Sequence, residues 1–438
     1  MTKRTKIFSI ICGAFILIAA TTIFLFLTKV RKTVPAISFY GLPKVQVDAI
    51  KTQLEEISKK ENISFEYLEL DQAKPLEQQI SFVNKPSLLF VDGGENLRQA
   101  FDKADSKSGK IGFVSSITNE MTSSIRQKAH FAANANKKND EVPKNDGAQK
   151  SDSDSEFAPE TLVTALPILS SHFEIDIDFS AFKSSGLSAI ATWDDLETFA
   201  RIEKRTKDFP IIFAGKDAEL FADLLGAITE AFYGLEDYNK AAELLCVKDG
   251  EKFNATRIAK RLTEDSNAPF SKPISFLNDW YKKGLIHKDV FALSKNDVRA
   301  FLKARLASVA FMSLDDHREY DTKVISRYAS IYFPSPRNAG ERNFVAPVTY
   351  AVPFESREEI SQLCSELVSA ESEEILARQT GLAPVLNHCR TPDKQASDAR
   401  YWVAASGVPL EGLSKEAKLT HEELAQVMAE LAEMVKAK

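Results

Sequence analysis

Cysteine is scarce in this chain, with four residues in a total of 438. Cys12 lies in an apolar N-terminal run, and the other three are Cys246, Cys364 and Cys389. An odd set of three cannot pair completely, so a fold held together by disulfides is excluded. At most one bridge can form among them, and the sequence does not decide whether it does.

Enzyme motifs are also missing. The chain contains no glycine-rich phosphate loop, HExxH, GxSxG or CxxC. Its 56 basic and 62 acidic residues give a net charge of -6, and no long basic run is interleaved with aromatic residues. This composition excludes a strong nucleic-acid interface. We therefore expect no enzyme activity, no catalytic residues and no cofactor.

One long apolar run is present, at the N-terminus. The segment Ile7–Thr28 carries no charge and has the length needed to span a bilayer. Its strongest apolar part, Ile23–Leu27, follows the small residues Ala19 and Ala20, which is unlike a cleavable signal peptide. Cys12 follows two isoleucines, which is unlike a lipidation site. The run predicts an uncleaved membrane anchor, and basic residues on both sides of it leave its orientation undetermined.

Strands and helices alternate after the anchor. Ile37–Leu42 and Pro86–Val91 are typical of strands, and an amphipathic helical pattern over 45–57 lies between them. Such alternation predicts a parallel sheet, in which ligands bind beyond the carboxyl ends of the strands. The candidates by position are Phe39, Tyr40, Gly41, Asp92, Gly93 and Ser115.

Residues 134–156 are rich in Lys, Asn, Asp and Ser, with a single valine. Such a segment has almost nothing to bury, which predicts a mobile insertion. The alternative is a segment that docks on a partner. Beyond it, LVTALPIL (162–169) and FEIDIDF (173–179) are both extended, and we expect the chain to cross there between two units.

Capping boxes mark three helix starts, at Thr192–Asp195, Ser294–Asp297 and Ser356–Glu359. The first places Trp193 in the opening turn of a helix whose apolar face includes Leu196 and Phe199. We interpret this tryptophan as a packing residue rather than a ligand-binding one.

The strongest polar cluster is DDHREYD (315–321), which follows the apolar strand SVAFM (308–312). A metal site could use Asp315, His317 and Asp321. The presence of Arg318 among them favours a solvated loop or an ion-pair network, so we expect no metal.

In order, these segments resemble the extracellular solute-binding proteins of bacterial carbohydrate ABC importers, the maltose-binding-like group called family 1. The matching stretches are ISFYGLP, ALPIL with FEIDIDF, ATWDDLETFARI, WYKKGLIHKD (280–289), NDVRAFLKARLASVAFM (296–312), YFPSPRN (332–338) and residues 349–385. Together they cover nearly all of 36–410.

The resemblance implies an α/β fold of two lobes joined by hinge crossings, preceded by the transmembrane anchor. The implied divisions are an anchor at 1–32, a first lobe at 33–171, a second lobe at 172–348, a return to the first lobe at 349–384 and second-lobe C-terminal helices at 385–438. It implies a membrane-tethered protein on the periplasmic side that captures a carbohydrate-like solute between its lobes and delivers it to importer permease subunits. The alternative is a degenerate relative that acts as an interaction or sensing subunit of the cell envelope.

The expected solute contacts come from both lobes. Tyr40 and Asp92 follow from strand-end geometry. The resemblance adds His172 at the first crossing, Asp315 or Asp316 in the second lobe and Tyr350 at the return. Tyr233 is included as an aromatic residue beside a predicted turn.

Overall fold

The computed structural model describes residues 34–81, 84–104, 111–131, 162–335 and 342–437. The predicted anchor Ile7–Thr28 and the predicted insertion 134–156 lie outside these ranges. Within them, no helix combines the length and the apolar character needed to cross a membrane.

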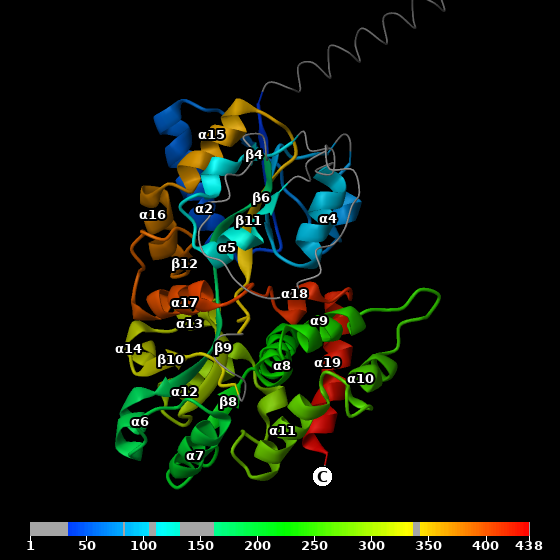
Figure 1. Ribbon diagram of the computed structural model, residues 1–438, viewed down its shortest axis with the longest axis vertical. Coiled ribbons are helices and arrows are strands. Elements are labelled where there is room, and N and C mark those ends of the chain that lie inside the picture. The colour runs from blue at the N-terminus through cyan, green and yellow to red at the C-terminus, as the bar shows by residue number, and fades with distance from the viewer. Residues whose placement is uncertain (1–33, 82–83, 105–110, 132–161, 336–341, 438) are drawn as a thin grey trace, which may run out of the picture.

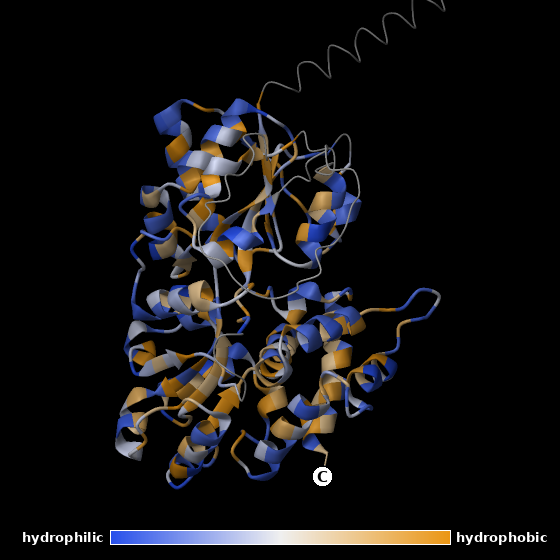
Figure 2. Ribbon diagram, in the orientation of Figure 1, coloured by the Kyte–Doolittle hydropathy of each residue, from blue (hydrophilic) through white to orange (hydrophobic). Residues whose placement is uncertain are grey.

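The described chain forms two α/β lobes, one above the other in Figure 1. Each lobe has its own buried hydrophobic core. Hydrophobic residues concentrate on the strands and inner helix faces of both lobes, and hydrophilic residues on the outer helix faces (Figure 2). The two-lobed architecture agrees with the sequence-based expectation.

The first lobe is built on a mixed sheet. Its elements are β1 (Ala36–Tyr40), α2 (Lys44–Glu61), β2 (Glu66–Tyr67), α3 (Leu76–Gln79), β3 (Leu88–Asp92), α4 (Glu95–Ala104), β4 (Phe113–Val114), α5 (Ser123–Lys128), β5 (His130–Phe131), β6 (Leu162–Ser170), β11 (Val348–Pro353), α15 (Glu358–Leu367), α16 (Ala370–Thr380), β12 (Ala383–Pro384) and α17 (Lys394–Ala405). The sheet order is β12-β6-β11-β3-β1-β2, and β4 and β5 also pair with β6.

Strand β1 pairs in parallel with both β2 and β3, as the strand–helix alternation predicts. The crossing strand β11 is antiparallel to both β3 and β6. The expectation of a parallel sheet is therefore wrong for the half of the sheet that leads into the hinge. Strand β11 returns from the second lobe and so runs opposite to β6, the strand that leads into that lobe, and β12 is antiparallel to β6 as well.

The second lobe surrounds a smaller sheet. Its elements are β7 (Phe173–Asp178), α6 (Phe179–Ser185), α7 (Trp193–Glu203), β8 (Ile211–Phe213), α8 (Ala218–Tyr233), α9 (Leu235–Leu244), α10 (Ala255–Thr263), α11 (Ser271–Lys282), α12 (Lys295–Lys303), β9 (Val309–Ser313), α13 (Leu314–Arg318), α14 (Thr322–Ile325), β10 (Tyr328–Ile331), α18 (Leu413–Glu416) and α19 (His421–Lys436). The sheet order is β10-β7-β9-β8.

The C-terminal segment 385–438 divides between the lobes. Ala399 and Val403 of α17 lie in the first core, although this helix was expected in the second lobe. Leu413 of α18 and Leu431 of α19 lie in the second core. Helix α17 differs because it packs on α5 and β12.

Three chain segments pass between the lobes side by side, and we call them the hinge ribbon (171–173, 344–347 and 410). The amides of Ser171 and Phe173 donate to the carbonyls of Pro347 and Val345, both at 2.8 Å. Leu410 pairs on the other side, since its carbonyl accepts from Ala346 at 2.8 Å. The crossings are therefore bonded to one another rather than independent linkers.

Helix starts follow the sequence in two of the three predicted capping boxes. Those of Thr192–Asp195 and Ser294–Asp297 are both formed. The box predicted at Ser356 is not formed, because α15 begins at Glu358 with Arg357 at the N-cap position and no side-chain cap. The packing role of Trp193 is confirmed, since its ring is buried against Phe232 and Phe276.

Candidate functional site

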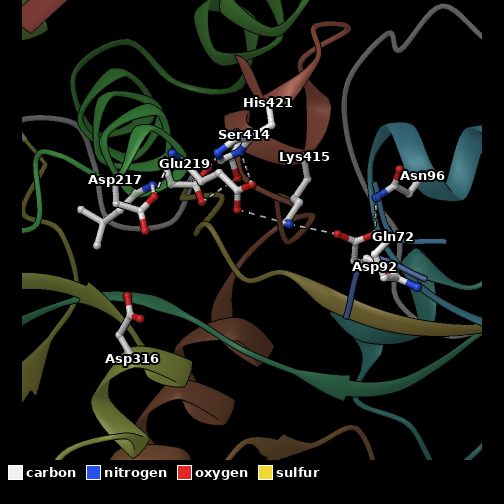
Figure 3. A network of polar contacts seen from close by, with 12 residues as sticks. Gln72, Asp92, Asn96, Asp217, Glu219, Asp316, Ser414, Lys415 and His421 are labelled. Carbon is white, nitrogen blue, oxygen red and sulfur yellow. Dashed lines mark hydrogen bonds and ion pairs between the residues drawn. The ribbon is translucent and has the colours of Figure 1, made fainter. Parts of the chain in front are cut away.

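The candidate site lies where the carboxyl end of β3 meets the second lobe (Figure 3). Strand β3 ends at Asp92, and the chain turns through Gly93 and Gly94 into α4. Gly94 has φ of +68°, and a Cβ there would lie 2.2 Å from the carbonyl oxygen of Lys415. A glycine is needed at this turn because the backbones of the two lobes approach so closely.

Lys415 links the lobes at this point. Its ammonium lies 3.0 Å from Asp92 Oδ2 and 3.6 Å from Glu219 Oε2 at the start of α8. Asn96 donates to the other oxygen of Asp92 at 2.8 Å. Burial raises the pKa of Asp92, against the opposing effect of Lys415. Burial alone would lower the pKa of Lys415, but Asp92 and Glu219 hold it above its ordinary value. We call Lys415, Asp92 and Glu219 the Lys415 bridge.

Tyr350 contributes to a second polar group at the same sheet end. Its ring is fully buried in β11, and its hydroxyl donates to Glu411 Oε1 at 2.6 Å. Lys128 forms an ion pair with the same carboxylate at 2.6 Å. Tyr40 lies on the same row of the sheet, because both tyrosines are in register with Val91. Both rings are buried in this structure rather than presented to a solute.

Asp315 connects α13 to the first lobe. Its Oδ1 accepts from Gln46 of α2 at 2.8 Å, and its Oδ2 accepts from Ser171. Gln46 in turn accepts from the hydroxyl of Thr349 at 2.8 Å. This chain of hydrogen bonds runs from the second lobe, through α2, to β11.

Asp316 is held within the second lobe. Its Oδ1 lies 2.8 Å from the ammonium of Lys295, which also lies 3.4 Å from Asp217. Burial raises the pKa of Asp316, opposed by Lys295. Figure 3 places Asp316 apart from the Lys415 bridge, on the same side of the junction as Asp217.

His172 lies in the hinge ribbon and is fully buried. Its ring packs beside Trp402 and Phe344, with centroid distances of 5.2 and 5.7 Å. Neither ring nitrogen has a hydrogen-bond partner among the described residues. Burial lowers the pKa of His172 to about 3, and Arg342 adds to this effect. The ring is therefore neutral at physiological pH.

Tyr233 lies far from the other predicted contacts. It is the last residue of α8, whereas Ala218 and Glu219 at the other end of that helix lie near the Lys415 bridge. The helix rise separates its two ends by roughly 22 Å. The structure thus brings Tyr40, Asp92 and Tyr350 to one end of the first sheet and does not bring Tyr233 to them.

A cavity of about 510 Å³ opens beside the Lys415 bridge. Its lining residues all belong to the second lobe and include Asp217, Glu219, Lys295 and His421. The lining comes mainly from the first turns of α8, α12 and α19. A polar solute could hydrogen-bond to these charged groups.

Sequence reasoning missed Lys415, Glu219, Glu411 and Gln46. Their roles depend on which helix ends meet across the junction, and no local pattern marks them. A signal did exist for Glu174 and Asp176, which alternate with apolar residues in FEIDIDF. The alternation puts both carboxylates on one face of β7, but that face is buried rather than solvated.

The segment DDHREYD forms an ion-pair network, one of the two arrangements expected. It begins with the short helix α13, capped by Ser313. Arg318 pairs with Asp393, and Glu319 pairs with Arg299. His317 is turned away from Asp315 and contacts Glu174 and Asp176 instead.

Comparison with known proteins identifies the fold. No family model and no curated protein sequence matches the chain. Among solved structures it is similar to the bacterial solute receptor AcbH, described as having an exclusive preference for β-D-galactopyranose. The TM-score is 0.60 at 11% identity, over 92% of this chain and 97% of that one.

Two further structures agree with this result. A chitin oligosaccharide binding protein matches with a TM-score of 0.59 at 12% identity, over 92% of this chain and 99% of that one. RafE from Streptococcus pneumoniae matches with a TM-score of 0.58 at 11% identity, over 92% and 96%. The chain therefore has the two-lobed fold of these solute receptors.

Proposed function

We propose that this protein is a membrane-tethered solute-binding protein that captures a carbohydrate-like solute between its lobes and delivers it to an ABC importer. The observation that supports the proposal most directly is the match of both lobes, over nearly the whole chain, to receptors whose names specify sugars. The Lys415 bridge and the Asp315 hydrogen bonds lie at the junction of the lobes, where this fold binds its ligands.

A solute at this junction would compete with the protein's own contacts. Asp92, Glu219 and Asp315 each have a partner within the protein in this structure. A sugar hydroxyl can replace such a partner, and the charged groups then orient it. Solute binding would thus exchange internal ion pairs and hydrogen bonds for contacts with solute.

The pairing of these polar groups with one another within the protein also favours a second candidate function. A junction whose polar groups satisfy one another, and whose tyrosines Tyr40 and Tyr350 are buried, fits an interaction or sensing subunit of the cell envelope that no longer binds solute. In that case the Lys415 bridge would hold the lobes together permanently.

Thermal unfolding with a panel of solutes separates these functions. The full chain in mild detergent would be tested with galactose, raffinose, maltotetraose and chitin oligosaccharides, each beside a matched sugar alcohol. The transport proposal expects at least one sugar to raise the Tm by several degrees, because a ligand that binds only the folded state stabilises it.

The variant Lys415→Met tests whether the Lys415 ammonium competes with the solute for Asp92 and Glu219. If neither the wild type nor Lys415→Met responds to any sugar in the panel while both remain folded, the transport proposal is abandoned in favour of the interaction subunit. A response in Lys415→Met alone would show that the site is retained but blocked by its own lysine.

A further inference from the structure

A second polar cluster lies inside the second lobe, away from the junction. Glu174 and Asp176 project from the same face of β7, because alternate residues of a strand share a face. His317 reaches them from α13, which follows the neighbouring strand β9. All three side chains are fully buried, with no exposed surface.

The three side chains converge on one point. His317 Nδ1 lies 2.7 Å from Glu174 Oε1 and 3.1 Å from Asp176 Oδ2. One ligand-capable atom from each residue lies within 4.8 Å of the others. A tetrahedral zinc site with bonds of about 2.1 Å separates its ligand atoms by about 3.4 Å. The imidazole nitrogen therefore needs to move away from the two carboxylate oxygens by about 0.7 and 0.3 Å to admit an ion.

The cluster has more buried acceptors than donors. Ser330 donates to Asp176 Oδ1 at 3.0 Å, and His317 supplies one N–H through Nδ1. Glu174 Oε2 has no hydrogen-bond donor in the part of the chain that the structure describes, and Asp176 Oδ2 has only its ion-pair contact with His317. Buried carboxylate oxygens without donors are costly, and the His317 ring is the one cationic group that contacts these two carboxylates in the described part of the chain.

We propose that Glu174, Asp176 and His317 form a binding site for one divalent transition-metal ion of the zinc type. Two carboxylates and a neutral imidazole carry a charge of -2, which a divalent ion neutralises inside the lobe. Beside the two carboxylates the free ring is an imidazolium; when the ion binds at Nδ1, the proton of that nitrogen leaves to solvent, and the ring stays neutral with its other proton on Nε2. The mixed nitrogen and oxygen donors favour zinc and its neighbours over magnesium or calcium, which prefer more ligands and oxygen alone.

A metal at this position would act on the junction indirectly. Helix α13 carries His317 together with Asp315 and Asp316, and Asp315 bonds to Gln46 of the first lobe. Tying α13 to β7 fixes the position of these two aspartates. The ion is thus a structural element of the second lobe, with no catalytic role.

Metal retention tests this proposal. The full chain in detergent would be stripped with a chelator, incubated with zinc or magnesium and passed through gel filtration before elemental analysis. We expect about one zinc per chain to be retained and no magnesium, together with a rise in Tm of several degrees for zinc. Cobalt should give the visible absorption bands of a low-coordinate site.

Substitutions locate the ion. Glu174→Gln and His317→Gln should each lower zinc affinity by at least tenfold, whereas His388→Gln, at an exposed histidine, should not change it. Asp176→Asn serves as a milder variant if the others do not fold, and the cobalt spectrum of the wild type is decisive without any variant. The proposal is overturned if the wild type retains no zinc, or if a folded His317→Gln protein retains as much as the wild type.

Discussion

At the residue scale, His172 shows how burial changes the chemistry of a predicted contact. The sequence placed it at the crossing between the lobes, and the structure does so too. Its ring is enclosed by aromatic residues and has no described hydrogen-bond partner. We therefore expect its main effect to be on acid stability rather than on solute contact.

The first prediction concerns His172→Phe. The pKa of this ring is about 3 in the folded protein and 6.5 as its ordinary value, so below about pH 6.5 only the unfolded chain takes up the proton. The wild type should lose stability as pH falls from about 6.5 towards 3, by about 2 kcal/mol at pH 5 from this group alone. The His172→Phe variant should lose less stability over the same pH range. The measurement is the free energy of unfolding in urea at pH 7 and pH 5.

An exposed histidine supplies the control for this experiment, since His388→Phe should keep the pH dependence of the wild type. Equal pH dependence in the wild type and in His172→Phe would show that the ring is not held neutral by burial.

At the scale of single elements, local signals were the reliable part of the sequence. The packing of Trp193 and two capping boxes depend only on residues within one or two helical turns, and all three are confirmed. The box at Ser356 failed because the chain enters α15 one residue later than the motif requires. Local patterns thus predict the start of a helix only where tertiary packing does not move it.

The second prediction tests the cap of α7. Thr192 accepts from the amide of Asp195 at 3.1 Å, and Asp195 accepts from the amide of Thr192 at 2.9 Å. Thr192→Ala should lower the free energy of unfolding by about 1 kcal/mol. Thr192→Ser keeps the hydroxyl and should cost much less. Equal losses in the two variants, measured by urea unfolding, would assign the effect to the lost methyl group instead.

The third prediction concerns α18 and the Lys415 bridge. Lys415→Met leaves Asp92 buried without its cation, which favours separation of the lobes so that water reaches the carboxylate. We expect a larger radius of gyration, measured by neutron scattering with the detergent contrast-matched. Lys418→Met, three residues along and exposed, should leave it unchanged. An unchanged radius in both variants would mean that other contacts keep the lobes closed.

At the scale of the whole molecule, the order of the segments predicted two lobes, but the contacts between them could not be predicted. The partners of Asp92, Asp315 and Tyr350 lie between 61 and 323 positions away in sequence, counting Glu411, Gln46 and Lys415. Such pairs depend on how two complete lobes meet, which no periodicity encodes. The buried acids Glu174 and Asp176 escaped for a different reason, since they lie within the second lobe: alternation puts both on one face of β7 but does not reveal that this face will be covered.

The fourth prediction concerns membrane topology. The uncharged run Ile7–Thr28 and the solute-receptor fold lead us to expect the anchor in the membrane and the two lobes outside the cytoplasm. Protease added to intact spheroplasts should degrade the lobes. Protection of the lobes in intact spheroplasts, with degradation after lysis, would reverse the orientation.

The hinge ribbon also determines which way the lobes can swing. Its three segments are joined side by side by backbone hydrogen bonds. A strip of this kind resists sliding of one segment along another, but it bends readily about an axis that lies in its plane. Contacts close to such an axis, including that of Asp315 with Ser171, change little as the lobes part. Contacts farther from the axis are displaced more for the same rotation of the lobes, so a small rotation is enough to break them. We therefore expect the lobes to open by rotation about this one axis. The contacts farthest from the hinge ribbon should break first, and those closest to it should break last.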